Sequence, residues 1–261
     1  MKGLLDRLAS GVVLVAEGYV FELERRGFLK AGPFVPEAVL ENPAAVTGLH
    51  KEFLRAGSDV VVACTYYGHR AKMKAVGRED RLETLNITAL KLAKEAAEPF
   101  EALVAGNLSN TWEYDPAVPN SAKAVRSIFA EQVEWAVQGG ADFIIAETFG
   151  HLGEARLALE AIKAGGLPAV ITFSPATGQS CDGFSWASGC RQLYDEGAEV
   201  VGGVVVVRYG ENPLGTDLSR LDPPMRSTYS CVFLRTVFSV AAPERLVEFR
   251  ARVNFDDGLI L

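Results

Sequence analysis

Several polar side chains in this chain stand where an apolar run ends, and the most prominent of them is Glu147. The run FIIAE (143–147) places this carboxylate directly after residues typical of a buried strand, where an unpaired charge is costly. Two interpretations stay open: the carboxylate holds the ammonium group of a ligand, or it forms a salt bridge with an arginine or lysine of a neighbouring loop. Thr148 follows it and belongs to the same candidate site.

Three other apolar runs end in a similar way. The candidate binding residues at their ends are Glu17 with Gly18, Tyr67, and Asn107. Glu17 has an alternative role, because an acid before the FELERRG turn would complement a helix dipole. Tyr67 and its neighbour Tyr66 also have an alternative role, because aromatic residues at strand ends often only pack against the core. The run that ends at Val204–Val207 differs, because valine neither binds a metal nor carries a proton.

The histidines and cysteines show no metal-ligating pattern. The chain contains His50, His69 and His151, and Cys64, Cys181, Cys190 and Cys231. No histidine is spaced from another histidine or a cysteine as metal ligands are, so we expect surface or helix-capping roles for all three. Cys64 is predicted to be a buried small hydrophobic residue. The two cysteines that flank the loop DGFSW lack a third ligand, and we expect reduced thiols throughout.

The elements that must position these residues follow from the pattern of apolar residues. Short β-branched runs predict buried strands, and segments with helical periodicity separate them. The expected strands lie near 12–16, 58–64, 102–107, 141–147, 168–173 and 198–207, and the expected helices near 36–56, 82–98, 121–138, 151–164 and 185–196. Three segments, AGSDVVVA (56–63), GGADFIIAE (139–147) and EGAEVVGGV (196–204), share a helix-ending glycine, an acid and a following strand.

This alternation predicts an α/β fold of the (β/α)8 TIM-barrel type, in which the candidate residues gather at the carboxyl ends of parallel strands. About six βα units are used by residue 207, so we expect an incomplete barrel portion over 1–207 and a divergent, irregular segment over 208–261. The apolar run 229–242 or a second copy of the chain could cover the open sheet edges.

The composition excludes several classes of function. With 49% hydrophobic residues, a net charge of −7 and no basic stripe, the chain is suited to a buried core and poorly suited to nucleic acid. No apolar run is long enough to cross a membrane, and the N-terminus does not resemble a signal peptide. We therefore expect a cytoplasmic protein with small-molecule substrates.

Several segments together resemble one known family. The stretch 16–73, from AEGYVFELERRG to TYYGHRAKM, closely resembles the start of the homocysteine S-methyltransferase family, in particular its betaine–homocysteine branch. The resemblance continues, in the same order, through LVAGNLSNT, EQVEWAVQGGADFIIAETF, LPAVITF and DEGAEVVGG, the last ending at residue 203. It implies a zinc-bearing (β/α) eight-stranded barrel that transfers a methyl group from betaine or a similar donor to the sulfur of homocysteine, giving methionine.

The resemblance also implies roles for individual residues. Glu147 matches the family glutamate that contacts homocysteine, and Tyr67 matches a tyrosine on the donor side. Glu17 and Gly18 stand where the family has an acid and a glycine after the first strand, although the betaine enzymes read Asp-Gly-Gly there.

The metal site is where this sequence departs from the family. The resemblance implies three zinc-binding cysteine thiolates, the first in a Gly-x-Asn-Cys motif after the sixth strand. Val205–Val207 stand in its place, and the sequence contains no adjacent cysteines to match the family's Cys-Cys pair. Because losing all three thiolates removes a zinc site rather than weakening it, we predict no tight zinc binding at this position and impaired methyl transfer.

Three functions stay open on the sequence. The first is homocysteine methyl transfer, and the second is a non-catalytic relative that keeps a substrate pocket or acts as a binding or oligomerising subunit. The third is a metal-free reaction with Glu147 as general base. The abrupt change after Gly202 fits either a diverged relative or a disrupted coding region.

Overall fold

The computed structural model describes residues 3–29, 35–175 and 179–203. Within these ranges one parallel sheet runs in the order β1-β2-β3-β4-β5, so each strand pairs with the next one along the chain. Its strands are β1 (Val60–Val62), β2 (Leu103–Ser109), β3 (Phe143–Phe149), β4 (Ala169–Phe173) and β5 (Val200–Gly203). This is the strand order of a (β/α) barrel, and it confirms the predicted α/β fold with a parallel sheet.

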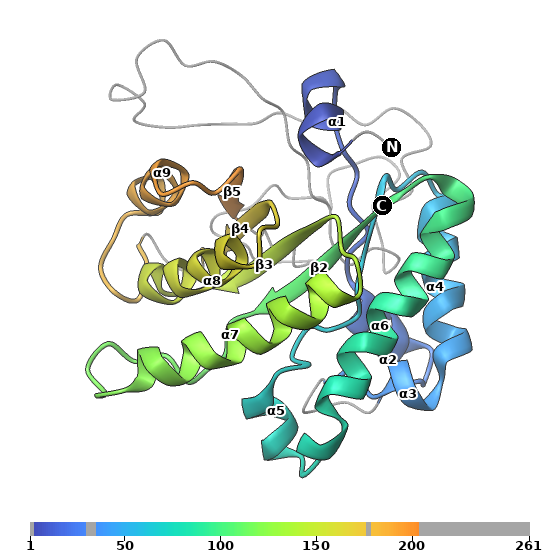
Figure 1. The fold of residues 1–261 in the computed structure, drawn as a ribbon, viewed down its shortest axis with the longest axis horizontal. Coiled ribbons are helices and arrows are strands. Elements are labelled where there is room, and N and C mark those ends of the chain that lie inside the picture. Colours follow the sequence, from blue (N-terminus) through green and yellow to red (C-terminus); the bar gives the residue numbers. More distant parts are fainter. Residues whose placement is uncertain (1–2, 30–34, 176–178, 204–261) are drawn as a thin grey trace, which may run out of the picture.

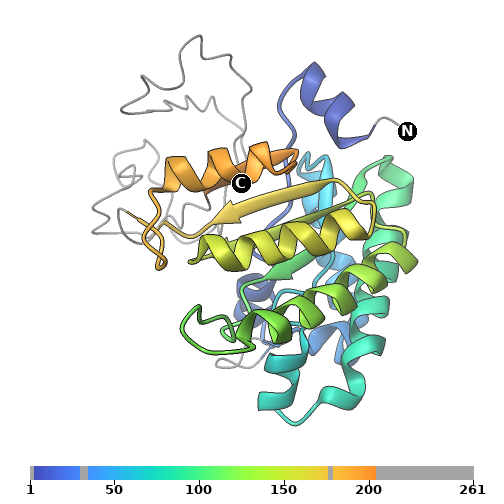
Figure 2. The same ribbon diagram turned by 60° about the vertical axis from the view of Figure 1, so that its left-hand side comes forward.

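Helices connect the strands and pack on the outside of the sheet (Figure 1). They are α1 (Leu4–Ser10), α2 (Tyr19–Arg25), α3 (Ala38–Glu41), α4 (Pro43–Arg55), α5 (Arg70–Ala75), α6 (Leu82–Ala97), α7 (Ser121–Gln138), α8 (Leu152–Ala164) and α9 (Trp186–Asp195), with short 3₁₀ turns η1 (Glu79–Arg81) and η2 (Glu98–Phe100). The helices α6 to α9 each contact the next and follow one another around the sheet (Figure 2). The strands are therefore covered, and every residue of β2 is buried.

The repeated glycine–acid motif has a structural explanation. Its glycines, Gly57, Gly140 and Gly197, all have positive φ, between 69° and 105°, which lets the chain leave a helix and turn into a strand. Each acid then accepts a hydrogen bond from a backbone N–H of the preceding strand segment. The three bonds are Leu14 N to Asp59 Oδ2 at 2.9 Å, Val104 N to Asp142 Oδ2 at 2.8 Å, and Ala169 N to Glu199 Oε2 at 2.6 Å. The repeat thus joins neighbouring strands at their beginnings.

Two predicted elements were wrong in detail. The segment 12–16 forms a single parallel bridge, Val15 to Val60, rather than a strand, although all three residues of β1 pair with β2 on the other side. It still lies beside β1, and the Ala16 N–H donates to the Val60 carbonyl at 2.9 Å. The helix expected over 36–56 is divided into α3 and α4, because Pro43 cannot continue the first helix and starts the second.

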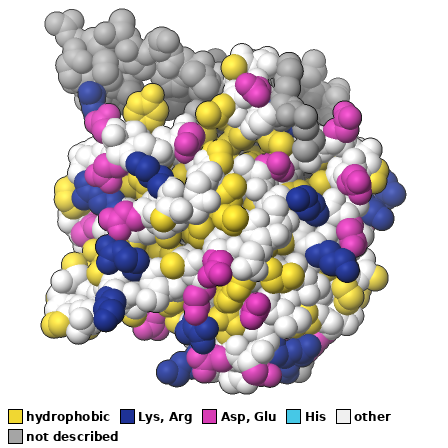
Figure 3. Space-filling model, in the orientation of Figure 1, with side chains coloured by type: hydrophobic (Ala, Val, Ile, Leu, Met, Phe, Trp, Pro, Cys, Tyr) yellow, Lys and Arg dark blue, Asp and Glu magenta, His cyan; other side chains and the backbone are white. Residues whose placement is uncertain are grey.

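The C-terminal predictions fall largely outside the described residues. β5 confirms the start of the strand expected over 198–207, but Val204–Val207, the segment 208–261 and its apolar run 229–242 are not described. Of the helices in the described ranges, none combines the length and apolar character needed to cross a membrane. On the face seen in Figure 3, basic and acidic side chains are interspersed rather than gathered into patches of one sign.

Candidate functional site

The carboxyl ends of β2 and β3 bring Asn107 and Glu147 together. Both side chains are buried, with 4% and 6% of their surface exposed. The Asn107 Nδ2 donates a hydrogen bond to Glu147 Oε1 at 2.6 Å, across the parallel pairing of the two strands. The neighbouring backbone is held as well, because the Thr65 hydroxyl donates to the Asn107 carbonyl at 2.9 Å. An amide therefore fixes the orientation of the buried carboxylate.

Glu147 has no cation of its own in the described part of the chain. The ion pairs found there involve other acids, so the predicted alternative of a structural salt bridge is not formed within these ranges. Burial raises the pKa of Glu147 to about 7, against the smaller opposing effect of the Asn107 hydrogen bond. A positively charged ligand group would offset the cost of burying the ionised carboxylate.

Glu17 is the second carboxylate of this site. The residue is half-buried, but its Oε1 atom is shielded from solvent and has no hydrogen-bond partner among the residues that the structure describes. Burial, and then the negative charge of Glu147, raise the pKa of Glu17 well above its ordinary value. Gly18 follows with a φ of 80° and turns the chain into α2, whose start receives no side-chain cap. The alternative considered for Glu17, complementing the dipole of α2, stays open, because this acid directly precedes the N-cap of that helix.

Thr148 connects this pair to the loop after β1. Its hydroxyl oxygen lies 2.9 Å from the Tyr66 hydroxyl and 3.2 Å from Asn110 Oδ1. Thr148 has a φ of 65°, which is costly for a β-branched residue and is typical of sites where the surroundings enforce the backbone. Tyr66, which we did not predict as a site residue, is thus a direct contact of Thr148. The Tyr-Tyr pair at a strand end was the available signal.

Tyr67 lies at the rim of the same edge. Its ring centroid is 4.4 Å from that of Tyr66, and its hydroxyl accepts a hydrogen bond from Trp112 Nε1 at 3.2 Å. The ammonium of Lys72 lies over the Tyr67 ring, 4.3 Å from the centroid. Glu147, Asn107, Thr148 and Tyr67 are therefore linked directly or through Tyr66, Glu17 interacts with Glu147 through its charge, and Gly18 makes the turn that follows Glu17.

The prediction that all three histidines are surface or capping residues was wrong for two of them. His50 and His69 are completely buried. His50 lies on the buried face of α4, where its Nδ1 is 2.9 Å from the Tyr19 hydroxyl, and burial lowers its pKa to about 3. His69 has both ring nitrogens buried without a hydrogen-bond partner. His151, by contrast, is half-buried at the residue before α8.

The described residues do not fit a zinc site. They contain no group of three or more His, Cys, Asp or Glu side chains that could hold a metal ion. Burial raises the pKa of Cys64 to about 12, which confirms it as a buried thiol and disfavours the thiolate that binds zinc. Cys181 and Cys190 are free in the structure. The predicted loss of the zinc position at Val205–Val207 lies outside the described ranges and stays a prediction.

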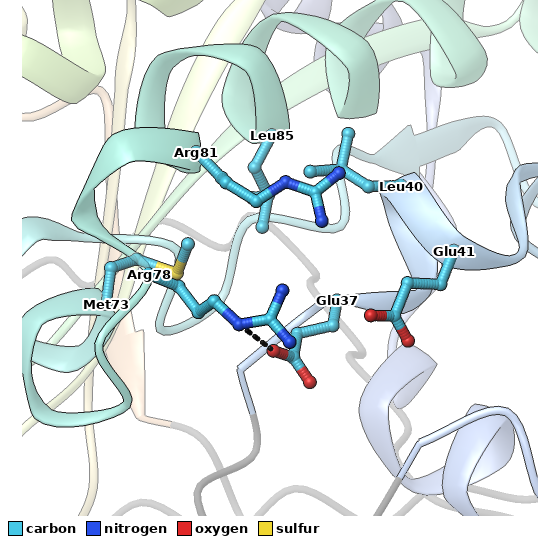
Figure 4. Close-up of a pocket in the computed structure, with 7 residues that line it drawn as sticks. All are labelled: Glu37, Leu40, Glu41, Met73, Arg78, Arg81 and Leu85. Atoms are coloured by element: carbon cyan, nitrogen blue, oxygen red, sulfur yellow. Dashed lines mark ion pairs between the residues drawn. The ribbon is translucent and has the colours of Figure 1, made fainter.

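A small hollow lies apart from these residues, between α3, α5 and the start of α6 (Figure 4). It is lined by Glu37, Leu40, Glu41, Met73, Arg78, Arg81 and Leu85. A salt bridge of 3.7 Å joins Arg78 to Glu37 at its mouth. None of the predicted site residues lines it, so the polar edge of the sheet is the better candidate.

Comparison with known proteins places the chain in a family. Residues 17–207 match the family described as homocysteine S-methyltransferase. The chain is 39% identical over 206 residues to pig betaine–homocysteine S-methyltransferase 1, covering 77% of this chain and 73% of that sequence. It is 41% identical over 208 residues to the bovine protein of the same name, of which it covers 50%. Against most of the curated relatives it matches, it spans about half their length.

The fold is similar to that of a solved homocysteine methyltransferase. The Escherichia coli protein MmuM superposes with a TM-score of 0.66 in its oxidized form, at 23% identity over 77% of this chain and 75% of that one. Its metallated form gives a TM-score of 0.62 over 73% of this chain and 74% of that one. The order of the strands, the family match over residues 17–207 and the identity to the mammalian enzymes agree. This chain belongs to the homocysteine S-methyltransferase family.

Proposed function

We propose that this chain binds homocysteine at the carboxyl edge of its sheet, with the ammonium group of the ligand held by Glu147 and Glu17. The observation that carries the proposal is a pair of carboxylates, the buried Glu147 and the half-buried Glu17 with its shielded oxygen, that has no cation in the described ranges. A ligand ammonium would offset the repulsion and the burial cost of both groups at once. Family membership and the names of the relatives support homocysteine as that ligand.

Each neighbouring residue has a physical role in this proposal. Asn107 would keep the Glu147 carboxylate turned toward the ammonium, since its amide already donates to Oε1. Thr148 would hold the adjacent loop through Tyr66. Tyr67, at the rim, would face the quaternary ammonium of the methyl donor, betaine or a similar compound. This arrangement orients the sulfur of the acceptor relative to the donor, which is the positioning that a displacement reaction needs.

The proposed reaction is methyl transfer to the homocysteine sulfur, and we infer that this chain performs it poorly. A thiol attacks as its thiolate, and at neutral pH a free thiol is mostly protonated. The described residues offer no group of metal ligands, and Val205–Val207 replace the first zinc cysteine of the family motif. The alternative, a homocysteine-binding relative without catalysis, is favoured by the same two observations.

The decisive test compares homocysteine with 4-mercaptobutyrate, which lacks only the amino group. We expect homocysteine to raise the melting temperature of the chain and the deamino analogue to leave it unchanged. Equal stabilisation by both compounds, or by neither, would contradict the proposed site. Methyl transfer from betaine, measured on the same preparation with its zinc content, separates the two functions. Rapid turnover with one bound zinc would overturn the inferred impairment, and binding without turnover would support it.

A further inference from the structure

A cation already occupies the aromatic surface beside the proposed donor side. Tyr67 and Trp112, which we call the aromatic rim, are joined by the hydrogen bond from Trp112 Nε1 to the Tyr67 hydroxyl. The ammonium of Lys72 lies 4.3 Å from the centroid of the Tyr67 ring and 5.6 Å from that of Trp112. Both distances are within the range at which an aromatic face attracts a cation. Lys72 is therefore shared between the two rings.

The backbone at both residues of the aromatic rim adopts an unfavourable conformation. Tyr67 and Trp112 have φ values of 58° and 64°, in the left-handed region that side chains rarely adopt. Such conformations persist where surrounding contacts enforce them, and they are common at ligand clamps. One of these contacts is visible next to Trp112: the buried Glu154 accepts hydrogen bonds from the Thr111 amide at 2.7 Å and hydroxyl at 2.6 Å. Trp112 nevertheless leaves 69% of its surface exposed.

Lys72 has no carboxylate to hold it elsewhere in the described ranges. It takes part in none of the ion pairs found there, although Arg70 on the same helix pairs with Glu131 at 2.7 Å. The charge of Lys72 also acts on the buried His69, whose pKa is lowered to about 4 by burial and then by that charge. In the described ranges the Lys72 ammonium is thus held by the rings of the aromatic rim. Cation–π attraction is weak enough for another cation to displace it.

We propose that Lys72 sets the specificity for the methyl donor by competing for the aromatic rim. A donor with a quaternary ammonium must displace the lysine ammonium from the two ring faces. If the donor also carries a carboxylate, the displaced ammonium of Lys72 can pair with it. A zwitterion therefore replaces the lost contact between Lys72 and the rings with an ion pair, and a simple cation does not. Lys72 therefore favours zwitterionic donors and disfavours simple cations. This inference rests on the proposed function in placing the donor beside Tyr67.

The test measures the binding of two probes, betaine and tetramethylammonium, by ligand-observed NMR at constant ionic strength. In Lys72→Met the simple cation should bind about three- to tenfold more tightly, because its competitor is gone. Betaine should gain no affinity or lose some, so the ratio of betaine to tetramethylammonium affinity should fall at least threefold. Lys74→Met, an exposed lysine on the same helix, is the matched control and should leave the ratio unchanged. Tyr67→Ala should weaken both probes.

The outcomes separate the inference from the proposed function. An unchanged ratio in Lys72→Met, or no betaine binding to the unaltered chain, would overturn the role of Lys72. Lys72→Gln provides a second neutral variant if the methionine variant does not fold. Homocysteine binding is measured separately on the same proteins. Its absence, together with a changed ratio, would contradict the proposed homocysteine site and leave the role of Lys72 standing.

Discussion

Acidic side chains on the helices and acidic side chains at the carboxyl edge of the sheet differ in their partners. On the helices, acids pair with arginines in contact with solvent, as in Arg126–Glu160 at 2.9 Å and Arg26–Glu52 at 2.6 Å. At the edge, Glu147 is buried beside an amide, and Glu17 has a shielded oxygen with no partner. The chain can pair its acids readily, and in the described ranges it leaves these two without a cation. The difference supports the proposal that the carboxyl edge binds a cationic ligand group.

The largest expected effect is on ligand binding when Glu147 is neutralised. We expect Glu147→Gln to weaken homocysteine binding by at least about thirtyfold, because removing one partner of a buried charge pair costs about 2–5 kcal/mol. Isothermal titration calorimetry gives the affinity. The control is Glu131→Gln, an acid that pairs with Arg70 on the helix surface, and it should bind homocysteine as the unaltered chain does. If both variants bind equally well, the two regions do not differ in function.

A smaller loss is expected when the orienting amide is removed. Asn107→Leu takes away the hydrogen bond to Glu147 and should weaken homocysteine binding about tenfold at pH 7, since a hydrogen bond to a charged group contributes about 1.5–3 kcal/mol. The bond also lowers the pKa of Glu147, so its loss should raise that pKa and move the pH dependence of binding to higher pH. A loss of affinity without a change in the pH profile would mean that Asn107 contacts the ligand instead.

The pH dependence of stability sharpens the comparison in the absence of ligand. The pKa of Glu147 is about 7 in the folded chain and near its ordinary value of 4.5 when unfolded. The contribution of Glu147 to the free energy of unfolding is therefore most favourable below about pH 4.5, and this contribution is lost as the pH rises to about 7. The melting temperature of Glu147→Gln minus that of the unaltered chain should grow between pH 5 and pH 8. A constant difference would show that the carboxylate is not penalised by burial.

The smallest effect is expected on the helix surface. Arg126→Ala removes the exposed ion pair with Glu160 and should change the free energy of unfolding by less than about 0.5 kcal/mol. Urea denaturation measures this, and homocysteine binding should be unaffected. A destabilisation above about 2 kcal/mol would mean that the surface pairs are as important as the buried edge.

The sequence predicted which residues lie at the carboxyl edge of the sheet better than it predicted their contacts. Periodicity and the residues after each apolar run were sufficient to predict the parallel sheet and to select Glu147, Asn107 and Glu17. The hydrogen bond between Asn107 and Glu147 depends on the register of β2 against β3, which pairs Ser109 with Glu147, and register is not encoded in either strand alone.

The errors have physical causes too. His50 and His69 were predicted to be surface or capping residues because neither shows metal-ligand spacing, but His50 lies on the buried face of α4 and His69 is buried at the N-cap of α5 without a side-chain cap. The rim contact of Lys72 with Tyr67 and Trp112 joins residues up to forty-five positions apart, and it requires positive φ at both aromatic residues. Neither backbone conformation could be read from residue type, because glycine is the residue that usually signals it.

The ionisation of Glu147 with and without ligand tests the central claim most directly. Carbon-13 labelling of glutamate carboxyls allows the titration to be followed by NMR, with Glu147→Gln assigning the resonance. The account predicts a midpoint near pH 7 in the free protein and a clear fall in that midpoint when homocysteine is added, because the ligand ammonium favours the charged carboxylate. A midpoint that stays the same when homocysteine binds would contradict the proposed role of the carboxylate pair.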